Sequence, residues 1–390
     1  PRGVSFDAAL ERLYVACADG VLAIWDAATR QVRRERLDVD LRDVVVLKRG
    51  LAVSRFRSAE VLLLDHDGRL RQRSRPLGGF EASPSVAWRM IAAPDGESVL
   101  VLHQMAQDTE VSIQPGGYGN FGCSVVTSAV TEIGEDGVPR GQVGLGTTLA
   151  MDVSVSASGL FTAVTPAELE GRRPATVSGR VEELPGGEGA QLCDFGSQFV
   201  RPEFEPGSFV AVAHRADGTL VRLSQDPPVL NIGGRVASFA TDRVVDTGQK
   251  LFHMNAGGGV ACASCHPEGA DDGHVWRFQE IGARRSQTIF GGLLGSEPFH
   301  WNGDMPSFQH LVSEVFQSRM GGGAMSAPQV AALAGWIDRI PAPPAPRARQ
   351  EPEVEAGRLL FHSAEVGCAG CHDGPRMGGV GAFDVGTGAV

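Results

Sequence analysis

The sequence lacks any apolar run of the roughly 18 residues that a membrane helix needs, so we expect no transmembrane segment. Lysine is almost absent, with Lys48 and Lys250 as its two examples, and the net charge is −11. This acidic balance argues against general nucleic-acid binding and favours small or basic partners. Apolar residues make up 42% and charged residues 21%, values that exclude a disordered chain, a collagen and a coiled coil.

Cysteine is also scarce, with seven residues in 390, yet four of the seven fall into two copies of one motif. C-x-x-C-H is the attachment sequence of c-type haem, in which two thiols add to the vinyl groups of a porphyrin and the histidine ligates the iron. About 0.003 matches are expected by chance in this composition. We therefore predict two covalently bound haems c, one at each copy, namely Cys262-Ala-Ser-Cys265-His266 and Cys368-Ala-Gly-Cys371-His372.

The alternatives for these motifs are a zinc site and a dithiol redox pair. Neither gives a reason for a histidine directly after the second cysteine in both copies. Because haem c is attached outside the cytoplasm, we expect a periplasmic or exported bacterial protein. Among the other cysteines, Cys17 reads as a buried thiol in a strand, and Cys123 and Cys193 form a candidate disulfide.

Residues 1–238 read as all-β. Short β-branched runs alternate with Asp-Gly pairs, which are typical of hairpin turns. These turns recur irregularly at a spacing of about 40 residues, the length of a four-stranded propeller blade, so we predict a β-propeller of about five to seven blades. A pair of β-sandwiches is the alternative. The Asp-Gly pairs begin at Asp19, Asp67, Asp95, Asp136 and Asp217.

From about residue 239 the pattern changes to that of helices. Phe308, Leu311, Val312 and Val315 share one helical face, and Ser307 is a suitable N-cap. The predicted fold is thus an all-β domain followed by mainly α tandem cytochrome c-type domains. The expected domains are a propeller over 1–238, a first haem domain over 239–340, a proline-rich linker over 341–350 and an incomplete second haem domain over 351–390.

Two regions resemble known families. The first two runs, around Tyr14 and Trp25, are similar to blades of YncE-like and WD-type propellers. Residues 240–390 resemble the di-haem cytochrome c peroxidase family, including its MauG-like branch. The segments that carry this resemblance, beside the two haem motifs, are Pro298–Asp304, Arg284–Phe290, Phe308–Met320 and Phe383–Gly388.

The peroxidase resemblance implies roles for particular residues. Trp301 matches the tryptophan that relays electrons between the two haems, and Glu314 is the candidate for the acid beside the open face of the first haem. His274 is a weaker candidate for a sixth iron ligand. Ser286 and Thr288 replace the asparagine and proline of the family's calcium-site segment, which weakens the case for calcium.

The function implied is reduction of hydrogen peroxide at the first haem, with electrons relayed from the second haem through Trp301. The partners would be peroxide and an electron-donor or substrate protein. One alternative is a MauG-like oxidase that modifies side chains of a partner protein. Another is a non-enzymatic periplasmic electron carrier that docks through its propeller.

Overall fold

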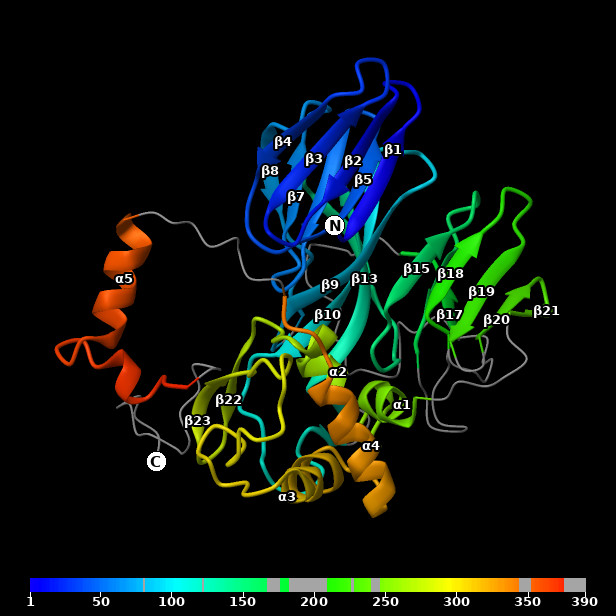
Figure 1. Ribbon diagram of the computed structural model, residues 1–390. Coiled ribbons are helices and arrows are strands. Elements are labelled where there is room, and N and C mark those ends of the chain that lie inside the picture. Colours follow the sequence, from blue (N-terminus) through cyan, green and yellow to red (C-terminus); the bar gives the residue numbers. More distant parts are fainter. Residues whose placement is uncertain are drawn as a thin grey trace.

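The computed structural model is built mainly from small antiparallel sheets, with short helices toward the C-terminal end (Figure 1). It describes residues 1–79, 81–120, 123–166, 176–181, 209–225, 228–239, 246–343 and 352–374. No helix in these ranges is long and apolar enough to cross a membrane, as the sequence predicts.

Five antiparallel sheets follow one another along the N-terminal part of the chain. Within each sheet, strands that follow one another in the sequence are hydrogen-bonded neighbours, with the short pair β11 (Gly119–Asn120) and β12 (Cys123–Ser124) inserted in the third sheet. The sheets contain β1 (Gly3–Asp7), β2 (Arg12–Ala16), β3 (Val21–Asp26) and β4 (Val32–Arg36); β5 (Leu41–Leu47), β6 (Gly50–Arg55), β7 (Val61–Leu64) and β8 (Leu70–Ser74); β9 (Ala82–Ala92), β10 (Ser98–Gln107), β13 (Val126–Gly134) and β14 (Pro139–Gly144); β15 (Asp152–Val155), β16 (Phe161–Val164) and β17 (Thr176–Gly179); and β18 (Ala211–His214), β19 (Leu220–Gln225), β20 (Pro228–Ile232) and β21 (Arg235–Ser238).

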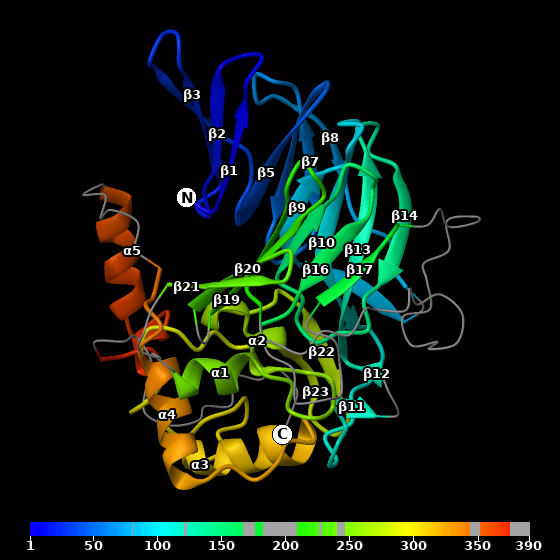
Figure 2. The same ribbon diagram turned by 90° about the vertical axis from the view of Figure 1, so that its right-hand side faces the viewer.

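The sheets pack in the manner of propeller blades. The first strand of each sheet is its innermost: β5 contacts β1 and β9, and β15 contacts β9 and β18. Successive blades therefore meet through their first strands, which is why β7, β8 and β14 lie toward the outside in Figure 2. The predicted propeller is confirmed in this part of the chain. Cys193 and the side chain of Cys123 lie outside the described residues, so the candidate disulfide stays a prediction.

The Asp-Gly pairs join neighbouring strands of the same blade, as the sequence predicts. Each glycine has a positive φ, a backbone conformation that costs other residues energy, and Gly20 has φ 93°. Gly20 also lies against the chain that leaves β4, since a Cβ there would be 1.8 Å from the carbonyl oxygen of Asp38. At Gly218, with φ 83°, a Cβ would meet no atom within 4 Å.

We expect Gly20→Ala to destabilise the protein more than Gly218→Ala. Both variants pay the cost of a left-handed alanine, about 1–2 kcal/mol, but only Gly20→Ala must also displace a backbone carbonyl. Urea unfolding followed by far-UV circular dichroism measures the difference. Equal losses for the two variants would contradict the close approach of Gly20 to Asp38.

One histidine is fully buried in the third sheet. The ring nitrogens of His103, on β10, lie 2.8 Å from Thr131 Oγ1 and 3.1 Å from the carbonyl oxygen of Gln104. Burial lowers the pKa of His103 to about 4. Protonation of His103 is therefore unfavourable in the folded state, whereas it occurs readily in the unfolded chain.

We expect His103 to weaken the fold in mild acid. Because its pKa falls from about 6.5 in the unfolded chain to about 4 in the fold, the stability it contributes is complete above pH 6.5 and is lost as the pH falls toward 4. That loss amounts to about 3 kcal/mol. Unfolding free energies of wild type and His103→Gln between pH 7.5 and 4.5 test this: the wild-type curve should fall more steeply, and parallel curves would refute the assignment.

The C-terminal part differs from the predicted tandem helical domains. It contains α1 (Thr247–His253), α2 (Cys262–Cys265), the hairpin β22 (Val275–Phe278) and β23 (Gly282–Arg285), α3 (Phe308–Leu311), a π-helix (Val312–Arg319) and α4 (Ala327–Asp338). These elements gather beneath the propeller sheets (Figure 2). The prediction of a helical cytochrome c-type fold is therefore wrong for this segment, because its helices are short and part of its structure is a β-hairpin.

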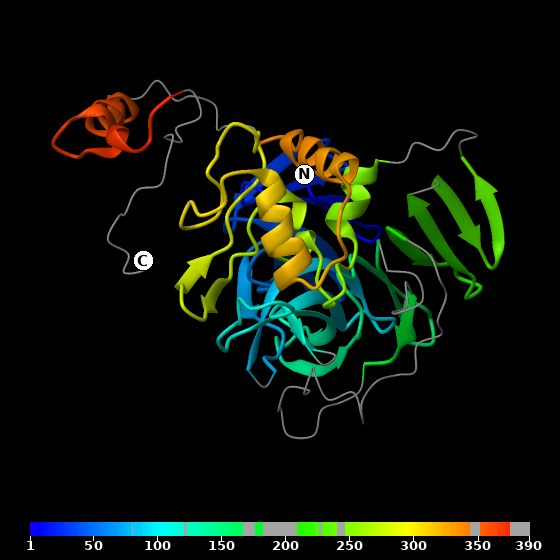
Figure 3. The same ribbon diagram turned by 90° about the horizontal axis from the view of Figure 1, so that it is seen from below.

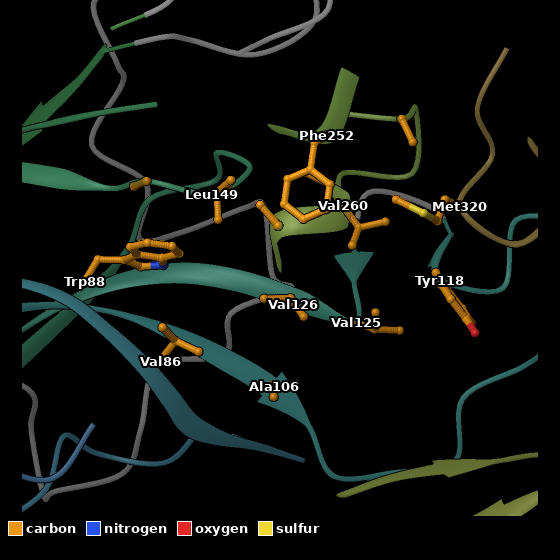
Figure 4. Close-up of a cluster of buried hydrophobic side chains, with 14 of the residues drawn as sticks. Val86, Trp88, Ala106, Tyr118, Val125, Val126, Leu149, Phe252, Val260 and Met320 are labelled. Atoms are coloured by element: carbon orange, nitrogen blue, oxygen red, sulfur yellow. The ribbon is translucent and has the colours of Figure 1, made fainter. Parts of the chain in front are cut away.

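Propeller and C-terminal segment share one hydrophobic core. Figure 4 shows Phe252 and Val260 packed beside Val125, Val126 and Leu149 of the propeller side. Phe252 is fully buried and Val260 is 1% exposed. The C-terminal segment thus buries part of its apolar surface against β13 and against the connections β10–β13 and β14–β15.

The second haem motif lies in a different setting. Helix α5 (Pro352–His362) and the 3₁₀ turn Cys368–Gly370 contain no buried residue, and Leu359 and Leu360 are 60% and 58% exposed. The helix stands apart from the rest of the described chain in Figures 1 and 3. The prediction of a second folded cytochrome module is wrong for residues 352–374, and residues 375–390, with the predicted segment Phe383–Gly388, lie outside the described ranges.

Candidate cofactor site

A cavity of about 290 Å³ lies between the C-terminal helices, the β22–β23 hairpin and the β10–β13 connection. Its walls are largely apolar, and the first CxxCH motif forms part of them. The aromatic residues of its lining include Phe252, Trp276, Phe278, Phe299, Trp301 and Phe308. A deep, apolar cavity with a few polar side chains is typical of a site for a cofactor or small ligand.

Two thiols reach this cavity from a single helical turn. Helix α2 begins at Cys262 and ends at Cys265, so the two side chains project from the same face at a spacing of three residues. The hydroxyl of Ser264 accepts a hydrogen bond from the backbone N–H of Ala261 at 3.1 Å and fixes the start of the turn. Burial raises the pKa of Cys262 to about 12 and that of Cys265 well above its usual value. Both sulfurs are therefore protonated at neutral pH in the absence of a bound group.

His266 follows directly on the same wall. Its Nδ1 lies 2.8 Å from the carbonyl oxygen of Gln287, and because a carbonyl can only accept, Nδ1 carries the proton. Burial lowers the pKa of His266, which keeps the ring neutral. Nε2 then has a lone pair available, the arrangement typical of a metal-ligating histidine held by a backbone carbonyl.

The two thiols and the neutral ring of His266 are therefore the groups on this wall that could hold a cofactor. The described part of the chain contains no group of three or more His, Cys, Asp or Glu that could hold a bare metal ion. The calcium site, already doubtful from the sequence, has no support among the described residues. The expectation of two covalently bound haems in tandem cytochrome domains is wrong, since the described residues form no such helical domains.

The second motif does not reach this cavity. Cys368, Cys371 and His372 are absent from its lining and lie on the 3₁₀ turn beyond α5. The ring of His372 lies 6.5 Å, centroid to centroid, from that of Phe361 on α5. Cofactor binding by these three residues stays a prediction.

The candidate catalytic residues differ in their placement. Trp301 lines the cavity, with its indole N–H donating to the carbonyl oxygen of Arg285 at 2.8 Å and its ring centroid 4.9 Å from that of Phe278. Glu314 does not line the cavity, although its neighbours Val315 and Phe316 do. Glu314 lies on the π-helix, and the apolar face predicted from Phe308, Leu311, Val312 and Val315 lines the cavity in its place.

His274, the weaker candidate for an iron ligand, also lies outside the lining. Its Nε2 is 3.1 Å from the carbonyl oxygen of Gln107, at the end of β10, and its ring packs on Trp276. His274 thus contacts the propeller. The sequence analysis missed Tyr118, His300 and Met320, which do line the cavity. The sequence offered one indication that His300 belongs to the site, because it directly precedes Trp301 within the segment that carries the peroxidase resemblance.

Ion pairs fix the loop after the first motif to the propeller. Glu268 pairs with Arg42 at 2.6 Å, and Asp271 pairs with Arg57 at 2.8 Å and with Arg285 at 2.7 Å. Burial alone would raise the pKa of Asp271, but the hydrogen bond from Arg285 and the charge of Arg57 lower it below its usual value. Both propeller arginines belong to the second blade, Arg42 on β5 and Arg57 between β6 and β7.

We expect Asp271→Asn to destabilise the protein by about 1–2 kcal/mol at pH 7, because it removes two ion pairs at a carboxylate that is nearly buried. The lowered pKa means that wild-type Asp271 contributes stability above pH 4, and this contribution is lost as the pH falls below that value. Wild type and variant should therefore converge in strong acid. Thermal unfolding across pH measures this, with Glu355→Gln as the control, since Glu355 pairs with Arg358 on the exposed helix α5.

No protein-family model matches the chain, and no curated protein matches it. Solved structures similar to it include Kuenenia stuttgartiensis hydrazine synthase, at 17% identity and a TM-score of 0.44, covering 62% of this chain and 72% of that one. The dihydro-heme d1 dehydrogenase NirN matches at 17% identity and a TM-score of 0.38, covering 59% of this chain and 43% of NirN. A Xanthomonas campestris gluconolactonase matches at 14% identity and a TM-score of 0.37, covering 60% and 72%. The peroxidase resemblance of residues 240–390 stays a prediction.

Proposed function

We propose that the cavity of the first CxxCH motif is the redox centre of a peroxidase. In this proposal the chain reduces hydrogen peroxide to two molecules of water, taking up two protons and two electrons that an electron-donor protein supplies. In this proposal Cys262, Cys265 and His266 would hold a redox-active group, which would supply the change of oxidation state when bound.

The observation that carries the proposal is the placement of three groups on one wall of an apolar cavity. Cys262, Cys265 and His266 all line it, and the 2.8 Å contact with Gln287 fixes the tautomer of His266. The apolar lining excludes water from whatever reacts there, which strengthens electrostatic interactions in the site.

Trp301 provides a route for the electrons. Its side chain lines the cavity and is partly exposed, so the indole reaches from the bound group toward the surface of the protein. An aromatic ring in this position is a suitable stepping stone between an external donor and the cavity. The proposal also carries the expectation of a periplasmic or exported location, where the thiols of such motifs are loaded.

A second candidate function is electron transfer without catalysis. Met320 lines the cavity and is 4% exposed, and its thioether could bind the redox group beside His266. A group bound by both side chains would exchange electrons but would not be accessible to peroxide. Met320 is therefore the residue that separates the two functions.

The test is peroxide-dependent oxidation of a reduced donor by the full-length protein matured in a bacterial periplasm. Horse cytochrome c serves as the donor, and stopped-flow absorbance follows its oxidation. We expect His266→Ala to lower kcat at least 100-fold, and Cys17→Ser, which removes a thiol outside the cavity, to leave it unchanged. Cyanide should bind the wild-type centre in competition with peroxide.

A protein that exchanges electrons with the donor yet neither consumes peroxide nor binds cyanide would overturn the peroxidase proposal in favour of electron transfer. In that case Met320→Ala should open the centre to cyanide. Activity that survives in His266→Ala would place the chemistry elsewhere.

A further inference from the structure

A buried carboxylate lies behind one wall of the cavity. Asp272, in the connection between α2 and β22, is 1% exposed, and its Oδ2 accepts from the indole N–H of Trp276 at 3.1 Å. Its other oxygen, Oδ1, accepts from the backbone N–H of His274 at 2.9 Å. Trp276 lines the cavity and Asp272 does not, so the carboxylate lies directly behind a residue of the wall.

Ser286 connects this carboxylate to the cavity. Its side chain forms a hydrogen bond with Asp272, and its Oγ lies 3.1 Å from the same indole nitrogen of Trp276. Ser286 lines the cavity and is 6% exposed. Because an ionised carboxylate can only accept, the hydroxyl of Ser286 then donates to Asp272. A protonated carboxyl can donate instead, which releases the hydroxyl hydrogen of Ser286 for a ligand in the cavity.

Burial makes the ionised form of Asp272 unfavourable. A carboxylate removed from water is costly unless a cation or several hydrogen bonds compensate for its lost hydration. Burial raises the pKa of Asp272 to about 6, although the hydrogen bonds from His274, Ser286 and Trp276 lower it in part. A fraction of the carboxyl groups is therefore protonated near neutral pH, as a proton donor requires.

The other ionisable groups nearby do not supply a cation to this carboxylate. Asp271 is paired with arginines and stays ionised, and its negative charge raises the pKa of Asp272 further. Cys265 stays protonated, because burial raises its pKa, and so adds no charge. Among the described residues, Asp272 itself forms no ion pair. The groups around it are Asp271 and His274 of the same connection, Cys265 of α2, Arg57 of the second blade and Arg285 of β23.

The proposed peroxidase needs a proton donor, since each peroxide molecule takes up two protons. Glu314, the acid expected from the sequence, does not line the cavity, and its described lining contains no aspartate or glutamate. A carboxyl group can therefore act on a ligand there only through another side chain. Ser286 is hydrogen-bonded to Asp272 and belongs to the lining, so it provides such a connection.

We propose that Asp272 and Ser286 form a pair that delivers a proton to peroxide in the cavity, an inference that rests on the proposed function. Ser286 is the catalytic residue, because it touches the substrate, and Asp272 acts through it. As the O–O bond breaks, Ser286 gives its hydroxyl proton to the oxygen that leaves as water and takes the carboxyl proton of Asp272. The electron-donor protein supplies the two electrons. The second proton comes from solvent, which also reprotonates Asp272 before the next turnover.

The first test is the pH dependence of peroxide reduction by the full-length protein, with horse cytochrome c as the donor. Wild-type kcat/KM should fall as the pH rises through the Asp272 pKa of about 6, because the donating form is then lost. Asp272→Asn should lower kcat/KM about 100-fold and abolish this dependence. Ser286→Ala should do the same, and the double variant should be no slower than either single variant, because the two residues form one path.

Two further variants serve as comparisons. Ser286→Thr keeps the hydroxyl group and should restore most of the activity that Ser286→Ala loses. Glu280→Gln changes an exposed carboxylate at the turn between β22 and β23, and it should match wild type in rate and in pH dependence.

The second measurement needs no peroxide. Infrared difference spectra of the wild-type protein between pH 7.5 and 4.5 should contain a carboxyl C=O band that Asp272→Asn lacks and that titrates with the pKa of about 6. In Ser286→Ala the midpoint should move to higher pH, because the ionised carboxylate loses a hydrogen bond that lowers its pKa. An unchanged midpoint in Ser286→Ala would show that the two side chains are not connected and would refute the pair.

The outcomes separate this inference from the proposed function. Wild-type rates in Asp272→Asn and Ser286→Ala, in a protein that consumes peroxide, would overturn the pair and leave the peroxidase standing. A slow Asp272→Asn variant that keeps the wild-type pH dependence would also overturn it, since Asp272 would then only hold Trp276 in place. A wild-type protein that consumes no peroxide would overturn both. Circular dichroism identifies a variant that fails to fold, and the comparison of Ser286→Ala with Ser286→Thr then decides.

Discussion

The site depends on the insertion of one propeller connection into the C-terminal segment. The residues between β10 and β13 leave the third blade and pair with both sides of the cavity. Val111 donates to the carbonyl oxygen of Arg277 at 2.7 Å and accepts from Gln279 at 2.9 Å, which extends the β22–β23 hairpin. Tyr118 pairs with the π-helix in the same way. Without this insertion the cavity would lose the wall that Val111, Tyr118 and Val125 form.

Desolvation by this shared core sets the chemistry of every polar group in the cavity. It holds the two thiols of α2 in their protonated form, keeps His266 neutral and removes water from Arg319. The loss of water has opposite consequences for neutral and charged side chains. A neutral side chain is stable in apolar surroundings, whereas a charged one needs a partner of opposite charge there. The ion pairs of Glu268 and Asp271 lie at the edge of the same region, where charges are paired across the boundary between blade and loop.

Local patterns predicted the structure well where local interactions decide it. Asp-Gly pairs gave the turns correctly because positive φ is a property of a single residue. Ser307 caps a helix as expected, through its hydroxyl, which accepts from the N–H of His310 at 3.2 Å. The helix it starts becomes a π-helix after Leu311, and Glu314 does not line the cavity. The tandem helical domains were wrong because part of the segment folds as the β22–β23 hairpin and its core is shared with the propeller.

In the two CxxCH motifs, too, the local sequence determines the helical turn, whereas tertiary packing determines its surroundings. Their sequences are nearly identical, and each forms a short helical turn that brings its thiols to one side. Around the first, Phe252 and Val260 close an apolar cavity against the propeller, and the pKa values of the thiols rise. Around the second, Leu359 and Leu360 of α5 remain exposed. The motif therefore defines which atoms can react, but the surroundings of the first copy alone give those atoms an enclosed site in the described structure. The function of each CxxCH motif therefore has to be inferred separately.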